Sequence, residues 1–293
     1  MFTSQQQKIS IVISTLGRSL ELIPMLESLS SQTLKPSEII IVDQNDDTRI
    51  DELLSSYKLD CSIKHLHHSE MRGLSNGRNA GWEQATGDFV LFADDDCWYP
   101  TDFLEKGLCI LQNVKADIIC GRAADDSGRS INGRFEGMPQ WVNRSNIWTT
   151  QIEWVVLFRR VTLQLTEGYA AHIGIGAASP WQSAEGQEIT LNALSKGAKI
   201  YYDPNWYGHH AEMPTQAPTP QIIKKAAGYA RGMGYVLGKN NYPYTSLLKW
   251  SGRPLIGACL HAIGLNWARS RYYRTIAANR MRGYFEGRKS EAA

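Results

Sequence analysis

Three consecutive aspartates, Asp94 to Asp96, are the strongest chemical feature of the sequence. They follow the apolar segment 88–92, which has the composition of a buried strand, and they precede Cys97-Trp98-Tyr99-Pro100. Adjacent carboxylates repel one another unless a cation or solvent neutralises them. Carboxylate oxygens are the ligands that Mg²⁺ and Mn²⁺ prefer, and such ions often bridge to substrate phosphates. The triplet therefore predicts a divalent metal site, with a solvated acidic turn as the alternative.

Two more polar residues follow strand-like segments. Thr15 ends the β-branched run 9–15, and Asp43 ends the run 38–43. Helix-like segments separate these runs, and alternating strands and helices of this length predict a mostly parallel sheet with helices on both faces. Ligands of such α/β sheets bind beyond the carboxyl ends of the strands. We therefore expect Thr15, Asp43 and the aspartate triplet to gather at one edge of the sheet.

Composition and length exclude several classes of protein. The chain has 293 residues, 43% of them hydrophobic and 20% charged, which is ordinary for a globular protein and excludes global disorder. A run of 18 apolar residues is absent from the sequence, so a membrane-spanning helix is not expected. The polar N-terminus predicts no signal peptide, and the five scattered cysteines predict reduced thiols in a cytoplasmic protein.

The nearly balanced total charge conceals a division along the chain. From Gln221 to the end there are 13 bases and two acids, a net charge of +11, whereas the preceding 220 residues carry 18 bases and 27 acids, a net charge of −9. Aromatic and apolar residues between Trp250 and Trp267 accompany the bases. This arm favours an anionic membrane surface as partner, with packing of its helices on the acidic body as the open alternative. No nucleic-acid-binding motif accompanies the bases, so nucleic acid is not expected as a partner.

Several ordered motifs resemble the family 2 glycosyltransferases, which have the GT-A fold. Residues 9–15 resemble the first strand of that family, and residues 32–43 resemble its second helix-to-strand unit. Residues 73–81, GLSNGRNAG, match the family signature GLSxxRNxG, and residues 89–100 carry its DxD region. The resemblance is densest over residues 8–110 and continues more loosely to about residue 210.

The resemblance implies an inverting, metal-dependent transferase with a Rossmann-like α/β body. In such an enzyme Asp43 would contact the base of a nucleotide-sugar donor, Thr15 would line the same pocket, and Arg78 would lie near the nucleotide. The usual DADD sequence of the family is Ala93-Asp94-Asp95-Asp96 here. Asp94 and Asp95 are therefore assigned to the donor, and Mg²⁺ or Mn²⁺ is assigned to Asp95 and Asp96, with the choice between these two ligands open.

The acceptor half of the resemblance supplies candidates for the base and for a further metal ligand. An inverting transferase needs one general base to deprotonate the acceptor hydroxyl. Glu185 occupies the acidic position of the family motif, and Glu188 lies one turn later on the same predicted helix, so either can serve. Some members of the family place a metal-binding histidine near the position of His209 and His210, which implies a metal-ligand role for that pair.

We therefore expect three regions in the chain. Residues 1–115 form the half that binds the nucleotide sugar, residues 116–212 form the acceptor half of the same GT-A domain, and residues 213–293 form a helical basic arm. The expected acceptor is a hydroxyl of a glycan or of a lipid-linked molecule, as in cell-surface polysaccharide synthesis. The expected location is the cytoplasm, with peripheral attachment to the inner face of the membrane.

Two other functions remain open at this stage. A catalytically inactive relative could serve as a binding subunit, because the first aspartate of the usual DADD sequence is missing. A nucleotidyltransferase acting on sugar phosphates would want a glycine-rich phosphate loop after the first strand, and the sequence has only Leu16-Gly17-Arg18 there. That second alternative is the weaker of the two.

Overall fold

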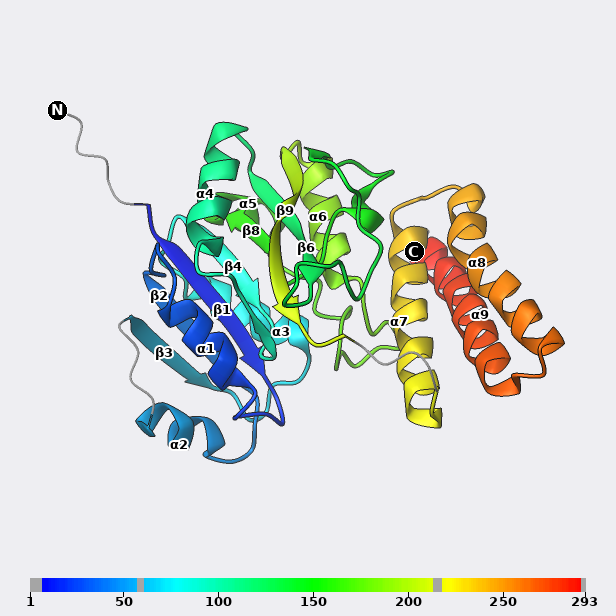
Figure 1. The fold of residues 1–293 in the computed structure, drawn as a ribbon, viewed down its shortest axis with the longest axis horizontal. Coiled ribbons are helices and arrows are strands. Elements are labelled where there is room, and N and C mark those ends of the chain that lie inside the picture. Colours follow the sequence, from blue (N-terminus) through cyan, green and yellow to red (C-terminus); the bar gives the residue numbers. More distant parts are fainter. Residues whose placement is uncertain (1–6, 57–60, 213–217, 291–293) are drawn as a thin grey trace. The chain divides into compact units, whose positions relative to one another are not determined.

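The structure is a computed structural model that describes residues 7–56, 61–212 and 218–290 (Figure 1). The chain divides into two compact units. The first unit comprises residues 1–169 and 189–212, and the second comprises residues 170–188 and 213–293. Residues 170–188, which the sequence analysis placed in the acceptor half, therefore group with the helices of the basic arm.

The first unit is built on one sheet, whose strands run in the order β3-β2-β1-β4-β8-β6-β9-β5, with β7 paired to β9. The pairings β3–β2, β2–β1, β1–β4 and β6–β9 are parallel. The pairings β4–β8, β6–β8, β5–β9 and β7–β9 are antiparallel. The strands are β1 (Ile9–Thr15), β2 (Glu38–Asp43), β3 (Ser62–His67), β4 (Phe89–Ala93), β5 (Cys97–Trp98), β6 (Ile118–Ala124), β7 (Gln140–Trp141), β8 (Val156–Arg159) and β9 (Ile200–His210).

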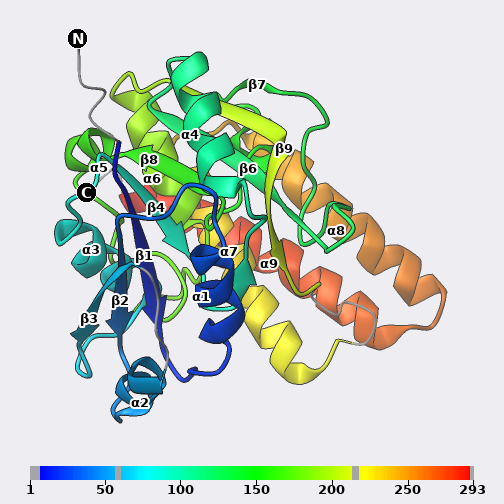
Figure 2. The same ribbon diagram turned by 60° about the vertical axis from the view of Figure 1, so that its left-hand side comes forward.

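Helices cover both faces of this sheet (Figures 1 and 2). Ile9, Ile11 and Ile13 of β1 point to one face, where they join the main hydrophobic core. Residues of α1 and α4 belong to the same core, whereas α3 lies against Val12, on the opposite face of β1. The helices of this part are α1 (Leu22–Ser30), α2 (Arg49–Ser56), α3 (Leu74–Glu83), α4 (Phe103–Asn113), η1 (Ile147–Thr149), α5 (Arg160–Thr166) and α6 (Glu185–Ser195).

Two glycines bring α3 unusually close to β1. A Cβ atom at Gly77 would lie 2.1 Å from Ser14 Oγ, and a Cβ at Gly81 would lie 2.3 Å from Val12 Cγ1. The two glycines are four residues apart and therefore share one side of the helix. The glycines of the GLSNGRNAG motif thus have a packing role, because they set the depth at which α3 rests on the sheet.

The second unit contains three long helices, α7 (Pro220–Lys239), α8 (Tyr244–Ile263) and α9 (Trp267–Ser290). Thr219 caps α7, because its side chain accepts a hydrogen bond from the Ile222 amide. Helix α9 packs against both α7 and α8, and Figure 1 shows it between them. Over residues 7–56, 61–212 and 218–290, no helix combines the length and the apolar character needed to cross a membrane.

Helices α7 and α9 touch through their backbones. A Cβ atom at Gly234 would come within 2.1 Å of the Arg280 carbonyl oxygen, and one at Gly283 would come within 2.1 Å of the Arg231 carbonyl oxygen. Gly238 and Gly287 make equally close approaches. Glycines at these positions let the two helices pack closer than any side chain would allow.

The predicted α/β fold with a large central sheet is confirmed. The GLSNGRNAG motif lies at the start of α3, and Glu185 and Glu188 share one helix, α6, as expected. The sheet is fully parallel from β3 to β4 and mixed beyond β4. Strand β9 runs as far as His210, and its last residues pair with the two-residue strand β5.

The packing of α3 yields a prediction about stability. Gly81→Ala should lower the free energy of unfolding by about 1–3 kcal/mol, because the added methyl group meets the buried Val12 side chain. The matched control is Gly252→Ala in α8, where nothing lies within 4 Å of the added carbon. Removing a glycine from an open helical position should stabilise by up to about 1 kcal/mol. Urea unfolding of both variants measures the difference, and equal stability would contradict the close contact.

Candidate active site

The strand ends bring the predicted donor residues to one edge of the sheet. In the register of the parallel strands, Thr15 lies opposite Asp43, and Ile13 lies opposite Ala93, the last residue of β4. The aspartate triplet begins one residue later. Because β2, β1 and β4 are adjacent and parallel, Thr15, Asp43 and the triplet converge as topology requires.

Asp95 is buried and held from two sides. Thr15 Oγ1 donates a hydrogen bond of 2.7 Å to Asp95 Oδ2, and the Arg18 guanidinium donates to Asp95 Oδ1. Burial raises the pKa of Asp95 to about 6, because the loss of solvent and the charges of Asp94 and Asp96 outweigh the partners that favour ionisation. Of the two carboxylates that Arg18 contacts, Asp95 and Asp96, Asp95 is therefore the less readily ionised.

Arg18 reaches the triplet from the loop after β1. Its guanidinium lies 2.7 Å from Asp96 Oδ2 in addition to its contact with Asp95. Gly17 has a positive φ of 78°, and its amide donates a 2.5 Å hydrogen bond to the Asn45 side chain, which fixes the turn that presents Arg18. The Arg18 side chain remains 39% exposed, so it has room to move.

Asp96 has a second partner on the last strand of the sheet. His210 Nε2 lies 3.2 Å from Asp96 Oδ1, because the antiparallel pairing of β5 with β9 places His210 opposite Cys97. Although burial opposes it, the hydrogen bond to His210 lowers the pKa of Asp96. The same hydrogen bond raises the pKa of His210. Two of the four predicted metal ligands, Asp96 and His210, are thus in direct contact.

His209 makes different contacts. Its ring stacks on Trp98 with centroids 5.8 Å apart, and its Nδ1 lies 3.0 Å from the Asp125 carbonyl oxygen. Consecutive residues of a strand point to opposite faces, so His209 and His210 point away from each other. The structure places His210 beside the aspartates and His209 against an aromatic ring.

Arg78 lies beneath the triplet on α3. Its side chain is 1% exposed, its NH2 group lies 2.9 Å from Asp94 Oδ1, and its guanidinium stands 5.3 Å from the centre of the Tyr169 ring. Tyr169 is in turn fixed by Asn79, which exchanges two hydrogen bonds of 2.8 Å with its backbone. The two residues of the Arg78-Asn79 dipeptide therefore have different contacts: Arg78 forms a salt bridge with Asp94, and Asn79 fixes Tyr169, whose ring lies beside Arg78.

Asp43 is fully buried, and both of its oxygens have partners. Oδ1 accepts hydrogen bonds from the Asn45 amide and side chain at 2.9 and 2.7 Å, and Oδ2 lies 3.1 Å from His65 Nε2. His65 contacts Asp51 through its other ring nitrogen. This network fixes the direction of the Asp43 carboxylate at the end of β2.

Arg18, Asn45 and His65 contact the predicted site residues but were not predicted from the sequence. Arg18 lies only three residues after the end of β1, so its long side chain can reach the acidic turn after the neighbouring strand β4. His65 lies on β3 beside β2, so its position in an adjacent parallel strand was the signal that linked it to Asp43. Asn45 had no signal beyond its distance of two residues from Asp43.

The ligand atoms of Asp96 and His210 suit a divalent ion that takes its other ligands from substrate phosphates. Over residues 7–56, 61–212 and 218–290, no three His, Cys, Asp or Glu side chains form a metal-binding group. Asp96 and His210 nevertheless offer an oxygen and a nitrogen ligand side by side. Mg²⁺ sites commonly use one or two carboxylates and take their remaining ligands from phosphates and water. Asp96 and His210 satisfy that requirement, and an ion there would compete with Arg18 for Asp96.

The predicted bases lie in the second unit, where α6 begins. Glu185 and Glu188 are 4% and 7% exposed. Glu188 forms a salt bridge with Lys239 of α7. Ala184, directly before the helix, has a positive φ of 71°, a conformation that costs about 1 kcal/mol or more for a residue with a side chain. The start of α6 is thus a strained position that presents two buried carboxylates.

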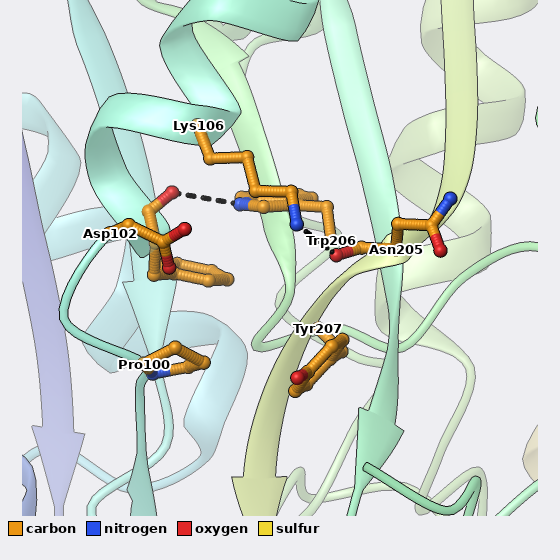
Figure 3. Close-up of a pocket in the computed structure, with 7 residues that line it drawn as sticks. Pro100, Asp102, Lys106, Asn205, Trp206 and Tyr207 are labelled. Atoms are coloured by element: carbon orange, nitrogen blue, oxygen red, sulfur yellow. Dashed lines mark hydrogen bonds between the residues drawn. The ribbon is translucent and has the colours of Figure 1, made fainter.

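A small hollow lies elsewhere on the first unit, between the start of α4 and β9 (Figure 3). Its volume is about 80 Å³, and Trp206 and Lys106 close it through hydrogen bonds to the carbonyl oxygens of Phe103 and Asn205. Ligand pockets usually measure about 300–1,000 Å³. This hollow is therefore too small for a nucleotide sugar, and none of the predicted site residues lines it.

The mixed sheet and the acidic turn after β4 define a protein of the GT-A fold. Residues 10–178 match the family model described as glycosyl transferase family 2, which covers more than half of the chain. The chain therefore belongs to the glycosyl transferase family 2.

Individual relatives match part of the chain. Glycosyltransferase YwdF of Bacillus subtilis, itself uncharacterized, is 37% identical over 99 residues, which are 34% of this chain and 36% of that protein. The GalNAc(5)-diNAcBac-PP-undecaprenol beta-1,3-glucosyltransferase of Campylobacter jejuni is 36% identical over 92 residues, 30% of this chain and 29% of that enzyme. The matched part thus spans about a third of the length of each relative.

Solved structures share the fold over nearly the whole chain. TarS residues 1–349 of S. aureus, in complex with UDP-GlcNAc, superpose with a TM-score of 0.55 at 16% identity, covering 94% of this chain and 92% of that one. The mannosyltransferase PcManGT of Pyrobaculum calidifontis, in complex with GDP-Man and Mn²⁺, gives a TM-score of 0.60 at 14% identity, covering 98% of this chain and 87% of that one. At these identities the likeness concerns the fold alone.

The contact between Asp96 and His210 predicts a pH dependence. Because the hydrogen bond to Asp96 raises the pKa of His210, this histidine should stay protonated to higher pH than an ordinary histidine of pKa about 6.5. The contact should stabilise the fold fully below that ordinary value and lose its effect as the pH rises through the raised pKa of His210. Nitrogen-15 NMR titration in the presence of EDTA measures this pKa. Asp96→Asn is the control, and an unchanged titration in that variant would contradict the contact.

Proposed function

We propose that this glycosyltransferase moves a sugar, with inversion, from a nucleotide-sugar donor to a hydroxyl of a glycan or a lipid-linked acceptor, as in the synthesis of cell-surface polysaccharide. The observation that carries the proposal is the convergence of Thr15, Asp43 and the aspartate triplet on one edge of the sheet. The complexes of TarS with UDP-GlcNAc and of PcManGT with GDP-Man and Mn²⁺ support a nucleotide sugar as donor.

In the proposed mechanism the residues of the first unit bind and orient the donor. Asp43, whose direction Asn45 and His65 fix, binds the nucleotide base beside Thr15. Asp94, which Arg78 holds in place, and Asp95 line the donor at the end of β4. Asp96 and His210 would hold Mg²⁺ or Mn²⁺, which supplies a Lewis acid that stabilises the charge of the departing diphosphate.

Arg18 supplies a mobile positive charge to the same place. It neutralises Asp95 and Asp96 and is partly exposed. If a metal ion neutralised these carboxylates, the guanidinium would be free to bind a diphosphate oxygen, for which its planar set of donors is well suited. Arg18 therefore acts as a positioning group for the diphosphate.

Glu185 is the better candidate for the general base. The base must accept a proton from the acceptor hydroxyl as the hydroxyl attacks the anomeric carbon. Glu185 occupies the acidic position of the family motif, whereas the Glu188 carboxylate is already engaged in a salt bridge with Lys239 of α7. We therefore assign the base to Glu185 and a supporting role at the start of α6 to Glu188.

An anionic membrane surface is the proposed place of action. The C. jejuni relative is named for an undecaprenol-linked acceptor, which supports a lipid-linked acceptor here. The second unit carries 13 bases and four acids, a net charge of +9, so it would be attracted to anionic lipid. Peripheral attachment on the cytoplasmic side of a membrane, where the donor would be available, is part of this proposal.

Hydrolysis of donors tests the function directly, because water can replace the acceptor. In a panel of nucleotide sugars assayed with and without Mn²⁺, we expect one donor to be hydrolysed in a metal-dependent way. Asp96→Asn should lower that rate on the order of 10²-fold, because it removes a charged metal ligand. If no donor in the panel is bound or hydrolysed, the inactive binding subunit becomes the better description.

Arg18→Gln is the complementary variant for the metal assignment. Without the guanidinium, Mn²⁺ no longer competes with Arg18 for Asp96. Calorimetric titration in the absence of donor should therefore show tighter Mn²⁺ binding to Arg18→Gln than to the wild type, and weaker binding to Asp96→Asn. Equal Mn²⁺ affinity in all three proteins would place the metal elsewhere.

A second prediction concerns the base. Glu185→Gln should keep the donor affinity and lower the rate of donor hydrolysis by about 10²-fold or more, the usual effect of losing a general base. Glu188→Gln, an identical change one turn later, is the matched control and should have a smaller effect. The reverse pattern would move the base to Glu188, and full activity of both variants would remove the base from α6.

A further inference from the structure

The exposed side of α8 is more apolar than its packed side. Five large aliphatic residues of this helix are 40–80% exposed: Leu248, Leu255, Ile256, Leu260 and Ile263. Their spacing of three, four, seven and eight residues places them on one side of the helix. The buried residues of α8 are Leu247, Ser251 and Ala258, which are fewer and mostly smaller. We call the five exposed aliphatic residues the α8 face.

Such a surface differs from that of an ordinary helix in a globular protein. A surface helix normally turns its apolar stripe toward the core and its charged side toward solvent. Contiguous exposed apolar patches mark sites of interaction, whereas single exposed apolar residues do not. The patch continues beyond the end of α8, where Leu265 is 74% exposed and Trp267 is 65% exposed.

Bases border the α8 face. Lys249 and Arg253 are exposed on α8, and Arg271 and Arg274 are exposed on α9. Over the whole segment 213–293, the sequence contains only two acids, Glu286 and Glu291. A surface that combines aliphatic residues, a tryptophan and bases is complementary to an anionic lipid bilayer. A second copy of this unit would bring its own net charge of +9 against the same surface, which disfavours self-association.

We infer that the α8 face is a membrane anchor, with α8 lying in the plane of an anionic bilayer. Leu248, Ile256 and Ile263 would enter the boundary between headgroups and acyl chains. Lys249, Arg253 and Trp267 would remain at the level of the headgroups, where bases and tryptophan are favoured. This inference rests on the membrane attachment in the proposed function. It goes beyond that function because it assigns membrane binding to one helix face that takes no part in the transfer reaction.

The test is sedimentation of the 293-residue chain with vesicles of phosphatidylcholine, alone or mixed with phosphatidylglycerol. The wild type should pellet with the anionic vesicles only, and part of the binding should persist at high salt. The pair Ile256→Ser and Leu260→Ser should lose the salt-resistant part, with a partition coefficient lowered by about tenfold or more. The pair Lys249→Gln and Arg253→Gln should instead weaken binding at low salt, by about fivefold for each charge.

The chain provides a matched control on another helix. Val161 and Leu165 of α5 have the same spacing of four residues and are 63% and 48% exposed. Changing both to Ser should leave vesicle binding unchanged. Absence of wild-type binding, or an equal loss in the α5 pair, would overturn the inference. A dimer observed by sedimentation velocity without lipid would also overturn the inference if the Ile256→Ser and Leu260→Ser pair abolished it. A second copy of the chain would then cover the α8 face.

Donor hydrolysis in the same preparations separates this inference from the proposed function. Variants of the α8 face should hydrolyse the donor at the wild-type rate, because they lie outside the donor site, and circular dichroism should show that they are folded. A wild type that binds vesicles but hydrolyses no donor leaves the anchor standing and removes the proposed function. A wild type that hydrolyses donor but does not bind vesicles removes the anchor and leaves the proposed function standing.

Discussion

Mutual repulsion among three adjacent carboxylates is the constraint on which the first unit depends. Each carboxylate is balanced from a different part of the chain: Asp94 by Arg78, Asp95 by Thr15 and Arg18, and Asp96 by Arg18 and His210. Those partners belong to α3, to β1 and its following loop, and to β9. The sheet order and the close packing of α3 are what bring these partners together. Electrostatic balance at one turn thus connects residues nearly 200 positions apart.

The parts of the fold that could be predicted from the sequence are those with a local signal in hydrophobic periodicity or turn residues. The strands before Thr15 and Asp43 and the helix of the GLSNGRNAG motif are confirmed, because β-branched runs and helical spacing are local signals. The antiparallel joins at β8 and β5 had no such signal, because pairing between distant segments depends on tertiary context. The contact of His210 with Asp96 depends on that pairing, so sequence alone could suggest the histidine but not its partner.

The two units divide the chemistry of the chain between them. The first is acidic and carries the proposed donor residues, whereas the second is basic and carries both candidate bases at the start of α6. Helix α6 itself continues from the second unit into the first, because its residues from Ile189 onward belong to the first unit. A single helix therefore connects the segment that would receive the acceptor to the sheet that would bind the donor.

The glycine contacts between α7 and α9 have an evolutionary consequence. Gly234, Gly238, Gly283 and Gly287 stand so close to the opposite backbone that any side chain would force the helices apart. The exposed aliphatic residues of α8 face no comparable steric limit, since one aliphatic residue can replace another at an open surface. As sequences of this kind diverge, the four glycines should therefore be retained. The residues of the α8 face should instead be replaced by other apolar residues. A comparison of divergent relatives would then identify this helical unit by its glycines before any similarity in its surface is visible.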